Sequence, residues 1–254
     1  MVRHAIVTGC GRAAGIGSSV VKKLAAHGWH ISCCDVSCEP AFQQSLTSLG
    51  TSVVSFYPVD LTDSSAVSSF VQKAVEAFGP VHLLVNNAAV SNPYLQVEDP
   101  ANTSILTEFQ RVLSINLVAP FNLSRLVLPH MPDGDAAIVH VASTRARQSE
   151  PDSEAYAASK GGLCALAHAQ AASLGPRKIR VNAILPGWID TSTAGPTALR
   201  KEDHAWHSVG RVGLPDDVAE AVLFLADGRR SGFITGQDLV VDGGVSTRMR
   251  YPEE

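Results

Sequence analysis

Two ionisable side chains in the sequence could act together on a proton. Tyr156 and Lys160 are four residues apart in a segment with helical spacing, so both face the same side of a helix. A tyrosine has an ordinary pKa of about 10 and is a poor base at neutral pH, but a nearby cation favours the phenolate and lowers that pKa. The pair therefore predicts general acid and base chemistry, with Lys160 activating Tyr156.

Ser143 could hold an oxygen atom of the substrate. It ends a predicted strand thirteen residues before Tyr156. Open α/β sheets bind their ligands at the carboxyl ends of the strands, where a hydroxyl can hydrogen bond to a substrate oxygen. Each of these three residues alone would be common by chance, so the hypothesis depends on their combination.

A glycine-rich turn follows the first predicted strand and precedes a helix. It reads Thr8-Gly-Cys-Gly-Arg-Ala-Ala-Gly-Ile-Gly17. Glycines let the backbone approach a pyrophosphate, and a helix N-terminus supplies N–H groups and a positive dipole. Glycines also make ordinary turns, but the position at the first strand–helix junction favours a phosphate-binding role.

Asp35 closes the second predicted strand, eighteen residues beyond Gly17. A carboxylate at this place can accept hydrogen bonds from an adenosine ribose and would repel a 2′-phosphate. The charge argument therefore favours NAD as cofactor. NADP is the alternative, because Arg12 in the glycine loop could supply a compensating charge. An aspartate at this position could also simply cap a turn, as aspartates often do.

These side chains need a framework of alternating strands and helices. The predicted strands are Ala5–Thr8, His30–Asp35, Ser52–Val59, Val81–Asn86, Ala136–Ala142, Ile179–Leu185 and Asp238–Val241. The predicted helices are Ile16–His27, Ala41–Leu49, Ser64–Phe78, Thr103–His130, Glu154–Leu174 and Asp216–Leu225. This alternation predicts a doubly wound, parallel, seven-stranded α/β sheet in one domain spanning residues 1–254, with helices on both faces.

One long stretch, approximately residues 187–210, lacks a strong period and is predicted to form a lid over the site. Its His204, Trp206 and His207 are more simply explained as a local cluster than as substrate contacts. Within the predicted helix Thr103–His130, Pro120 has no N–H to offer the carbonyl of Asn116, so we expect the helix to bend there.

Composition narrows the function classes. The chain has 254 residues, a formal charge of −4 and 45% hydrophobic residues, which predicts a folded core and gives no reason to expect a nucleic acid partner. Its five cysteines show no metal-ligand spacing, so we expect no metal site. We also expect a cytoplasmic protein with no membrane association, because no signal sequence or long apolar run is apparent.

In order and spacing, the motifs resemble those of the short-chain dehydrogenase/reductase family. They are Thr8–Gly17, Asp35, Asp60-Leu61, Asn86-Asn-Ala-Ala89, Asn116, Ser143, Tyr156 with Lys160, Pro186-Gly187, Gly210-Arg-Val-Gly-Leu-Pro-Asp-Asp and Ile234-Thr-Gly-Gln with Val241-Asp-Gly-Gly244. The resemblance covers nearly the whole chain. It implies a Rossmann fold and hydride transfer between a nicotinamide cofactor and a small alcohol or ketone, without a metal.

The resemblance also implies a role for each matching residue. Tyr156 would be the acid and base, Lys160 would lower its pKa and bind the nicotinamide ribose, Ser143 would polarise the carbonyl and Asn116 would support a proton relay. The implied cofactor-binding residues are Gly9, Gly15, Ile16, Gly17, Asp35, Asp60, Leu61, Asn87, Ala88, Tyr156, Lys160, Ile189 and Thr191. A homotetramer is implied as well.

Two features depart from the family pattern. Five residues, Cys10 to Ala14, separate Gly9 from Gly15, which makes the glycine loop two residues longer than usual. Ala89 replaces a glycine that commonly ends the Asn-Asn-Ala-Gly motif, and its methyl group would stand close to the cofactor. We expect an adjustment of the site and not a loss of binding.

Two alternatives compete with an NAD-dependent dehydrogenase. One is an NADPH-dependent carbonyl reductase of the same family. The other is a scaffold that binds nucleotide without chemistry, since a fold does not imply a function. The substrate stays open among polyols, hydroxysteroids, hydroxy acids and other ketones, because the loops that would shape the pocket vary freely.

Overall fold

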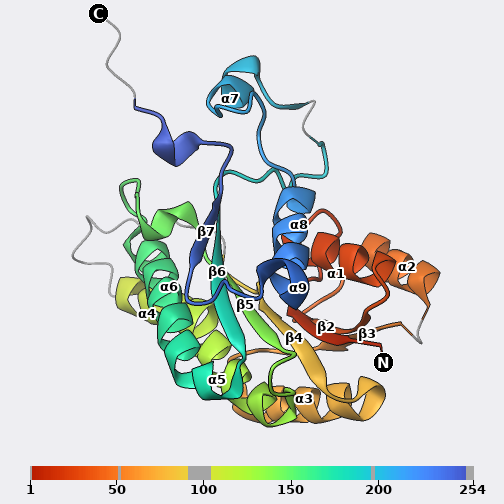
Figure 1. Ribbon diagram of the computed structural model, residues 1–254. Coiled ribbons are helices and arrows are strands. Elements are labelled where there is room, and N and C mark those ends of the chain that lie inside the picture. Colours follow the sequence, from red (N-terminus) through yellow and green to blue (C-terminus); the bar gives the residue numbers. More distant parts are fainter. Residues whose placement is uncertain (1, 51–52, 91–103, 196–197, 250–254) are drawn as a thin grey trace, which may run out of the picture.

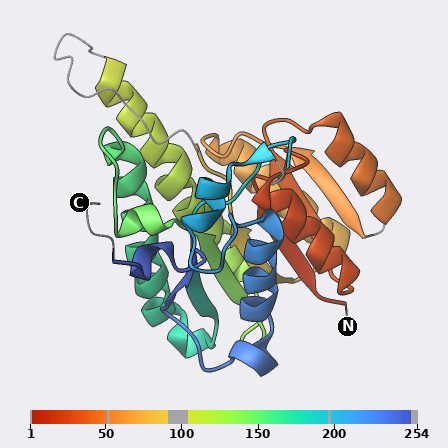
Figure 2. The same ribbon diagram turned by 90° about the horizontal axis from the view of Figure 1, so that it is seen from above.

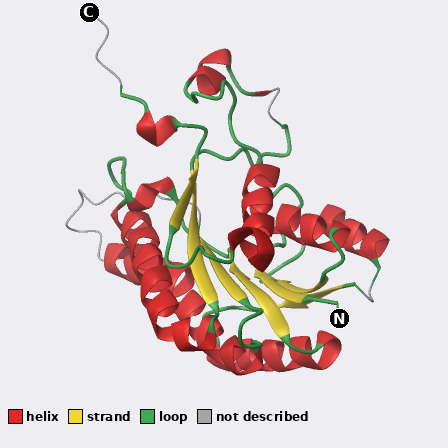
Figure 3. Ribbon diagram, viewed as in Figure 1, coloured by secondary structure: helices red, strands yellow, loops and turns green. Residues whose placement is uncertain are grey.

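Seven parallel strands form one sheet in the order β3-β2-β1-β4-β5-β6-β7 (Figures 1 and 3). The computed structural model describes residues 2–50, 53–90, 104–195 and 198–249. The strands are β1 His4–Thr8, β2 His30–Asp35, β3 Val54–Pro58, β4 Val81–Asn86, β5 Ala137–Val141, β6 Arg180–Pro186 and β7 Asp238–Val241. The predicted doubly wound parallel sheet is confirmed. Strands β2, β4 and β7 keep their predicted ends and the other described strand ends differ by at most two residues, while Ser52, the predicted start of β3, lies outside the described residues.

The strand order reverses between β1 and β4, which makes this the switch point of the sheet. Here Val7 of β1 pairs with Val85 of β4, so the glycine turn after β1 lies beside the Asn86-Asn87 turn after β4. Loops that leave neighbouring strands in opposite directions open a crevice between them. This crevice is where the site is built.

Helices cover both faces of the sheet, as the apolar strands predicted (Figure 2). On one face, α1 Ile16–Ala26, α2 Pro40–Leu49 and α8 Pro215–Ala226 share a core with Ala5 and Val7 of β1. On the other, α3 Ser64–Phe78, α5 Ala119–Val127 and α6 Glu154–Leu174 pack with Ile6 of the same strand. Alternate side chains of a strand point to opposite faces, so one short apolar strand serves both cores.

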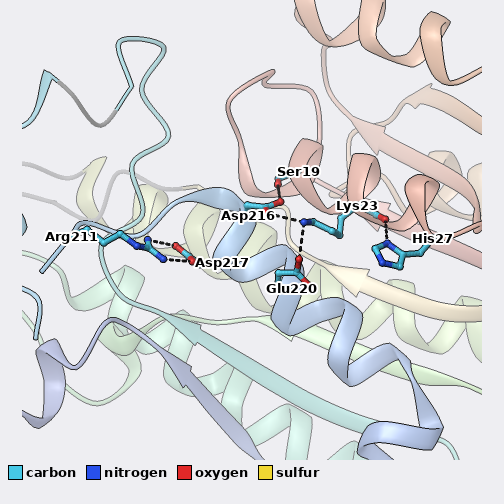
Figure 4. Close-up of polar contacts among 7 residues, drawn as sticks. All are labelled: Ser19, Lys23, His27, Arg211, Asp216, Asp217 and Glu220. Atoms are coloured by element: carbon cyan, nitrogen blue, oxygen red, sulfur yellow. Dashed lines mark hydrogen bonds and ion pairs between the residues drawn. The ribbon is translucent and has the colours of Figure 1, made fainter. Parts of the chain in front are cut away.

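Helices α1 and α8 also meet through polar side chains at their exposed edge (Figure 4). Lys23 of α1 forms ion pairs of 2.8 Å with both Asp216 and Glu220 of α8. Both acids are more than half exposed, so solvent screens these ion pairs and they add little to stability. The apolar contact beneath them is therefore the main link between the two helices.

The predicted helix Thr103–His130 is not one regular helix, which corrects the sequence analysis. It consists of α4 Ser104–Leu113, a π-helical turn Ser114–Val118, α5 and a 3₁₀ turn Leu128–His130, while Thr103 lies outside the described residues. The amide of Ala119 donates to the carbonyl of Ser114, five residues earlier. Pro120 interrupts the regular i to i−4 bonding just after this turn, and a π turn is one way to absorb the interruption.

This composite helix is the one segment of the described chain that is long and apolar enough to cross a membrane by length and composition alone. Its Leu123 and Val127 are buried in the core shared with α3 and α6. A helix buried in the core of a globular domain can be as long and as apolar as a membrane-spanning helix, so length and composition fit both.

The predicted lid contains structure that its composition did not reveal. A short helix, α7 Lys201–Ala205, lies within residues 187–210, and Ile189 pairs with Gly213 in an isolated bridge. Figure 1 shows α7 above the end of the sheet to which β6 and β7 run. Residues 196–197 of the predicted lid are outside the described part. The short helix α9 Gly228–Ser231 was also not predicted.

Candidate active site

A large cavity opens at the carboxyl ends of the strands, around the switch point. Its volume is about 1790 Å³. Small-molecule pockets typically hold roughly 300–1000 Å³, so this cavity has room for an extended ligand and a second molecule. The predicted site residues that line it are Gly9, Gly15, Ile16, Asp35, Asp60, Leu61, Asn87, Ala88, Ser143, Tyr156, Lys160, Ile189 and Thr191. Gly17 and Asn116, both within the described chain, do not line the cavity.

The glycine turn is packed so tightly that side chains would not fit. Gly9 has a φ of +70°, and a Cβ atom there would lie 2.5 Å from the Cα of Ala88. A Cβ atom on Gly17 would lie 2.3 Å from the carbonyl oxygen of Gly9. Asn87 locks the contact, because its Nδ2 donates to the carbonyls of Thr8 and Gly9 at 3.0 and 2.9 Å. The glycines are therefore required by the close approach of two turns.

The N-terminus of α1 faces the cavity at this turn. Gly15 and Ile16, at its start, both line the cavity. No side chain in the described chain caps the first turn of α1, whose N–H groups can therefore receive an anion. The site thus fits the pyrophosphate of a dinucleotide.

Asp35 lies at the far end of the same cavity, at the end of β2. Its Oδ2 accepts the N–H of Gly11 at 2.8 Å and its Oδ1 accepts the N–H of Val36 at 2.7 Å. The carboxylate is therefore held in place from both sides while it still lines the cavity. Asp60, after β3, is held similarly: Thr62 donates to it, and these bonds lower the pKa of Asp60.

Ser143, Tyr156 and Lys160 meet at the opposite end of the cavity. Tyr156 and Lys160 occupy successive turns of α6, with Nζ 5.5 Å from the centre of the phenol ring. Burial raises the pKa of Tyr156, while a hydrogen bond with Ser143 and the charge of Arg145 lower it. Because the effect of burial is the largest, the phenol keeps its proton at neutral pH. Ser143 and Arg145 act in the opposite direction and favour the phenolate.

Lys160 is buried with its ammonium beneath the ring of Tyr156. Its Nζ donates to the carbonyl of Val141 at 2.8 Å, and burial lowers its pKa to about 8. The sequence analysis expected Lys160 to lower the pKa of Tyr156. In the structure, the cation that lowers the pKa of Tyr156 is Arg145. Arg145 lies two residues after Ser143 and forms an ion pair of 2.6 Å with Glu150.

Asn116 does not line the cavity, but it hydrogen bonds to residues next to it. In the π turn, its side-chain Oδ1 accepts the N–H of Val90 at 2.8 Å, and its Nδ2 donates to the hydroxyl of Ser159 at 3.1 Å. Ser159 in turn donates to the carbonyl of Tyr156 at 2.7 Å. Asn116 thus ties the turn after β4 to the helix that carries Tyr156.

A buried histidine near Lys160, outside the cavity lining, is a supporting residue that was not predicted from the sequence. His140 of β5 lies beside Asn86 of β4, whose Nδ2 is 3.2 Å from its Nδ1, and its Nε2 is 2.9 Å from Oε1 of Gln170 on α6. Burial lowers the pKa of His140 to about 4. A neutral imidazole therefore connects two strands to α6. A polar residue within an otherwise apolar strand was the available signal.

No group of three His, Cys, Asp or Glu side chains in the described chain could hold a metal ion. The arrangement around Ser143 and Tyr156 supplies a proton donor and an oxygen-binding hydroxyl at one end of a dinucleotide-sized cavity. Chemistry at a carbonyl or hydroxyl carbon fits this arrangement.

Comparison with known proteins agrees with this geometry. A family model described as enoyl-(acyl carrier protein) reductase matches residues 9–246. An uncharacterized oxidoreductase of Thermotoga maritima is 42% identical and covers 98% of each chain. The structure of a short-chain dehydrogenase/reductase from Serratia marcescens superposes with a TM-score of 0.83 at 33% identity, over 96% of this chain and 98% of that one. The chain belongs to the short-chain dehydrogenase/reductase family.

As a member of this family the protein is an oxidoreductase. Two further proteins are similar over nearly their whole length. The 3-oxoacyl-[acyl-carrier-protein] reductase FabG of Chlamydia muridarum is 35% identical over 96% of this chain and 97% of its own. The apo structure of an SCOR enzyme from Clostridium thermocellum superposes with a TM-score of 0.85 at 37% identity, covering 99% and 96% of the two chains.

Proposed function

We propose that this protein transfers a hydride between NAD(H) and the carbon of a secondary alcohol or ketone, with Tyr156 as the general acid and base. The proposal rests on one cavity whose two ends carry different residues, one suited to binding a dinucleotide and the other to proton transfer. Gly9, Gly15 and Asp35 line one end, while Ser143 and Tyr156 line the other. A dinucleotide lying along the cavity would bring its reactive ring to the phenol.

The nicotinamide cofactor would supply or accept the hydride, while the protein handles the proton. In the reduction direction, the phenol of Tyr156 donates its proton to the substrate oxygen. Its raised pKa keeps that proton in place at neutral pH. Ser143 contributes a hydroxyl that can hold the same oxygen, and the N–H of Arg145 fixes the Ser143 Oγ at 3.2 Å.

The oxidation direction needs the phenolate of Tyr156. Burial opposes that charge, and the hydrogen bond with Ser143 and the charge of Arg145 favour it. We therefore expect alcohol oxidation to become faster with rising pH, as the phenolate population grows. Lys160 would also donate to the ribose next to the nicotinamide ring, because its ammonium has three N–H donors and the bond to the carbonyl of Val141 uses one of them.

Asp35 supports NAD as the cofactor. A 2′-phosphate would meet a carboxylate that two backbone N–H groups hold in place at the end of β2. The second candidate is an NADPH-dependent carbonyl reductase. A blue fluorescent protein crystallised with NADPH favours it, at 32% identity and a TM-score of 0.81, as does Arg12 in the glycine loop.

Initial rates with NAD, NADP and their reduced forms, measured over a panel of secondary alcohols and ketones, test the proposal. We expect turnover with NAD(H) and a lower kcat/KM with NADP(H). A higher kcat/KM with NADPH would favour the carbonyl reductase. Nucleotide binding without turnover of any substrate in the panel would favour the non-catalytic scaffold.

We also propose a homotetramer built on α4, α5 and α6. Leu106, Val118 and Phe121 are exposed large apolar residues on the first two segments and the π turn between them. Ala158, Ala165 and Ala169 are exposed on α6, where small side chains permit close helix approach. Pairing of these helices between subunits would cover both sets.

A further inference from the structure

The two extra residues of the glycine loop have a defined position in the fold. The segment 10–14 lies against the turn between β2 and α2. Gly11 contacts this turn so closely that a Cβ atom would lie 1.9 Å from the carbonyl oxygen of Ser37. The N–H of Glu39 donates to the carbonyl of Gly11 at 2.8 Å, which joins the two backbones.

Two carboxylates hold this extended loop. Asp35 accepts the N–H of Gly11, and the Oε2 of Glu39 accepts the N–H of Ala13, each at 2.8 Å. Glu39 is the N-cap residue of α2, but its side chain makes no cap hydrogen bond to that described helix. It reaches across to the glycine loop instead.

Both carboxylates line the same end of the cavity. The charged side chains of described residues at this end are Asp35, Glu39 and Asp60 against the single guanidinium of Arg12. The Nη2 of Arg12 is directed toward the carbonyl of Thr191 at 3.5 Å, on the lid side, and Arg12 forms no ion pair with these carboxylates in the described structure. Three carboxylates therefore line the part of the cavity that the proposed function gives to the adenosine ribose.

We propose that Glu39 is a second cofactor-specificity residue, which clamps the extended glycine loop and adds negative charge beside the 2′ position of the adenosine ribose. The inference rests on the proposed use of a nicotinamide dinucleotide. It predicts that removing Asp35 alone does not reverse the cofactor preference. Glu39 continues to repel the 2′-phosphate in such a variant.

Glu39 permits a cleaner test than Asp35. Both oxygens of Asp35 accept backbone N–H groups, so an asparagine there would turn its amide nitrogen toward one donor and disturb the loop. Only one oxygen of Glu39 is bonded to the loop in the described structure. In Glu39→Gln the amide oxygen can still accept the N–H of Ala13, so the charge is removed while the clamp remains.

The experiment measures dissociation constants of NAD and NADP by calorimetry, together with those of 5′-AMP and adenosine 2′,5′-bisphosphate. At low ionic strength we expect Glu39→Gln to tighten binding of the two 2′-phosphorylated ligands by about three- to tenfold. Binding of NAD and 5′-AMP should stay within about twofold, because neither carries the repelled phosphate. The gain should shrink with added salt, which screens an exposed charge.

Two further variants separate charge from clamping. Glu39→Ala also removes the acceptor for Ala13, so it should weaken binding of NAD as well. Glu76→Gln is the matched control, since Glu76 lies on α3, bonds to Gln72 and does not line the cavity. It should change none of the four dissociation constants.

The outcomes distinguish this inference from the proposed function. If wild type binds NAD more tightly than NADP and Glu39→Gln leaves the NADP dissociation constant unchanged, or shifts both cofactors equally, the role of Glu39 is wrong and the NAD assignment stands. If wild type binds NADP more tightly or binds neither dinucleotide, the proposed cofactor fails and the inference with it. A salt-sensitive gain confined to the 2′-phosphorylated ligands supports both.

Discussion

At the scale of single residues, Tyr156 offers the most direct test of the proposed chemistry. Tyr156→Phe removes the oxygen that would transfer the proton but keeps the ring that covers Lys160. We expect kcat to fall by about 10²–10⁴-fold while the dissociation constant of NAD changes little. Steady-state kinetics and calorimetry measure the two. Activity close to wild type would rule out the acid and base role.

Lys160 should behave differently from Tyr156. Lys160→Met keeps much of the buried stem but removes the ammonium that donates to Val141 and would bind the ribose. We expect both the turnover and the affinity for NAD to fall. The same two measurements apply, and a variant that loses turnover alone would leave Lys160 without a cofactor-binding role.

His140 predicts how stability depends on acid. Its pKa is about 4 in the fold, below the ordinary value of 6.5, so the folded state favours the neutral imidazole. Its contribution is complete above pH 6.5 and is lost as the pH falls toward 4, where the loss reaches about 3 kcal/mol. In His140→Gln this part of the loss should be absent.

Urea unfolding of wild type and His140→Gln between pH 4 and 7.5 measures this difference. His4, whose pKa burial also lowers to about 4, titrates in both proteins and therefore cancels in the comparison. The variant should be less stable at pH 7, because the bonds to Asn86 and Gln170 are altered, but the gap should narrow in acid. Parallel curves would show that His140 is not the titrating group.

At the scale of elements, two adjacent acids, Asp216 and Asp217, lie at the start of α8, and Asp217 is the one that hydrogen bonds to the backbone there. Asp217 accepts the N–H of Leu214 at 2.7 Å and pairs with both terminal nitrogens of Arg211 (Figure 4). Asp216 makes exposed contacts with Ser19 and Lys23. We expect Asp217→Ala to reduce the free energy of unfolding by about 1–2 kcal/mol.

Asp216→Ala is the matched control for that prediction. It should reduce the free energy of unfolding less than Asp217→Ala does, because its ion pair is exposed to solvent. Thermal and denaturant unfolding of both variants would measure the difference. Equal losses would mean that the contact between α1 and α8, and not the helix start, dominates at this place.

Pro120 provides a prediction for the π turn. Pro120→Ala restores an N–H group that can bond the carbonyl of Asn116, which would favour a regular helix. Asn116 would then shift relative to Val90 and Ser159. On the relay hypothesis, we expect slower turnover under proton-transfer-limited conditions and no change in affinity for NAD. Unchanged turnover with an unchanged solvent isotope effect would make Pro120 a packing feature.

At the scale of the whole molecule, the proposed tetramer predicts a response to surface charge. Val118→Glu places a carboxylate on the exposed face of the composite helix, where Val118 is 56% exposed. We expect it to lower the molar mass measured by light scattering at micromolar concentration. Phe233→Glu, which changes a fully exposed residue outside these helices, tests whether a different face is used. A wild-type monomer would contradict the proposal.

Strand and helix order could be predicted because each depends on local side-chain patterns. Runs such as Leu83-Leu84-Val85 of β4 are apolar without alternation, which is typical of a strand covered on both faces. The composite helix Ser104–His130 was predicted as one element because its π turn covers only five residues, too few to change the helical spacing of the whole run. Its cause, Pro120, was visible in the sequence, but the form that the interruption takes depends on packing.

The chemistry-bearing residues were also recognisable, because their types and spacing are local properties of the chain. Their partners were not. Glu39 bonds to Ala13 across 26 residues and His140 to Asn86 across 54, so neither contact leaves a periodic signal. Sequence alone thus indicated a dinucleotide-binding oxidoreductase fold with Tyr156 and Lys160 at its centre. Which cation lowers the pKa of Tyr156, and which second carboxylate bonds to the glycine loop, emerged only when folding brought distant segments together.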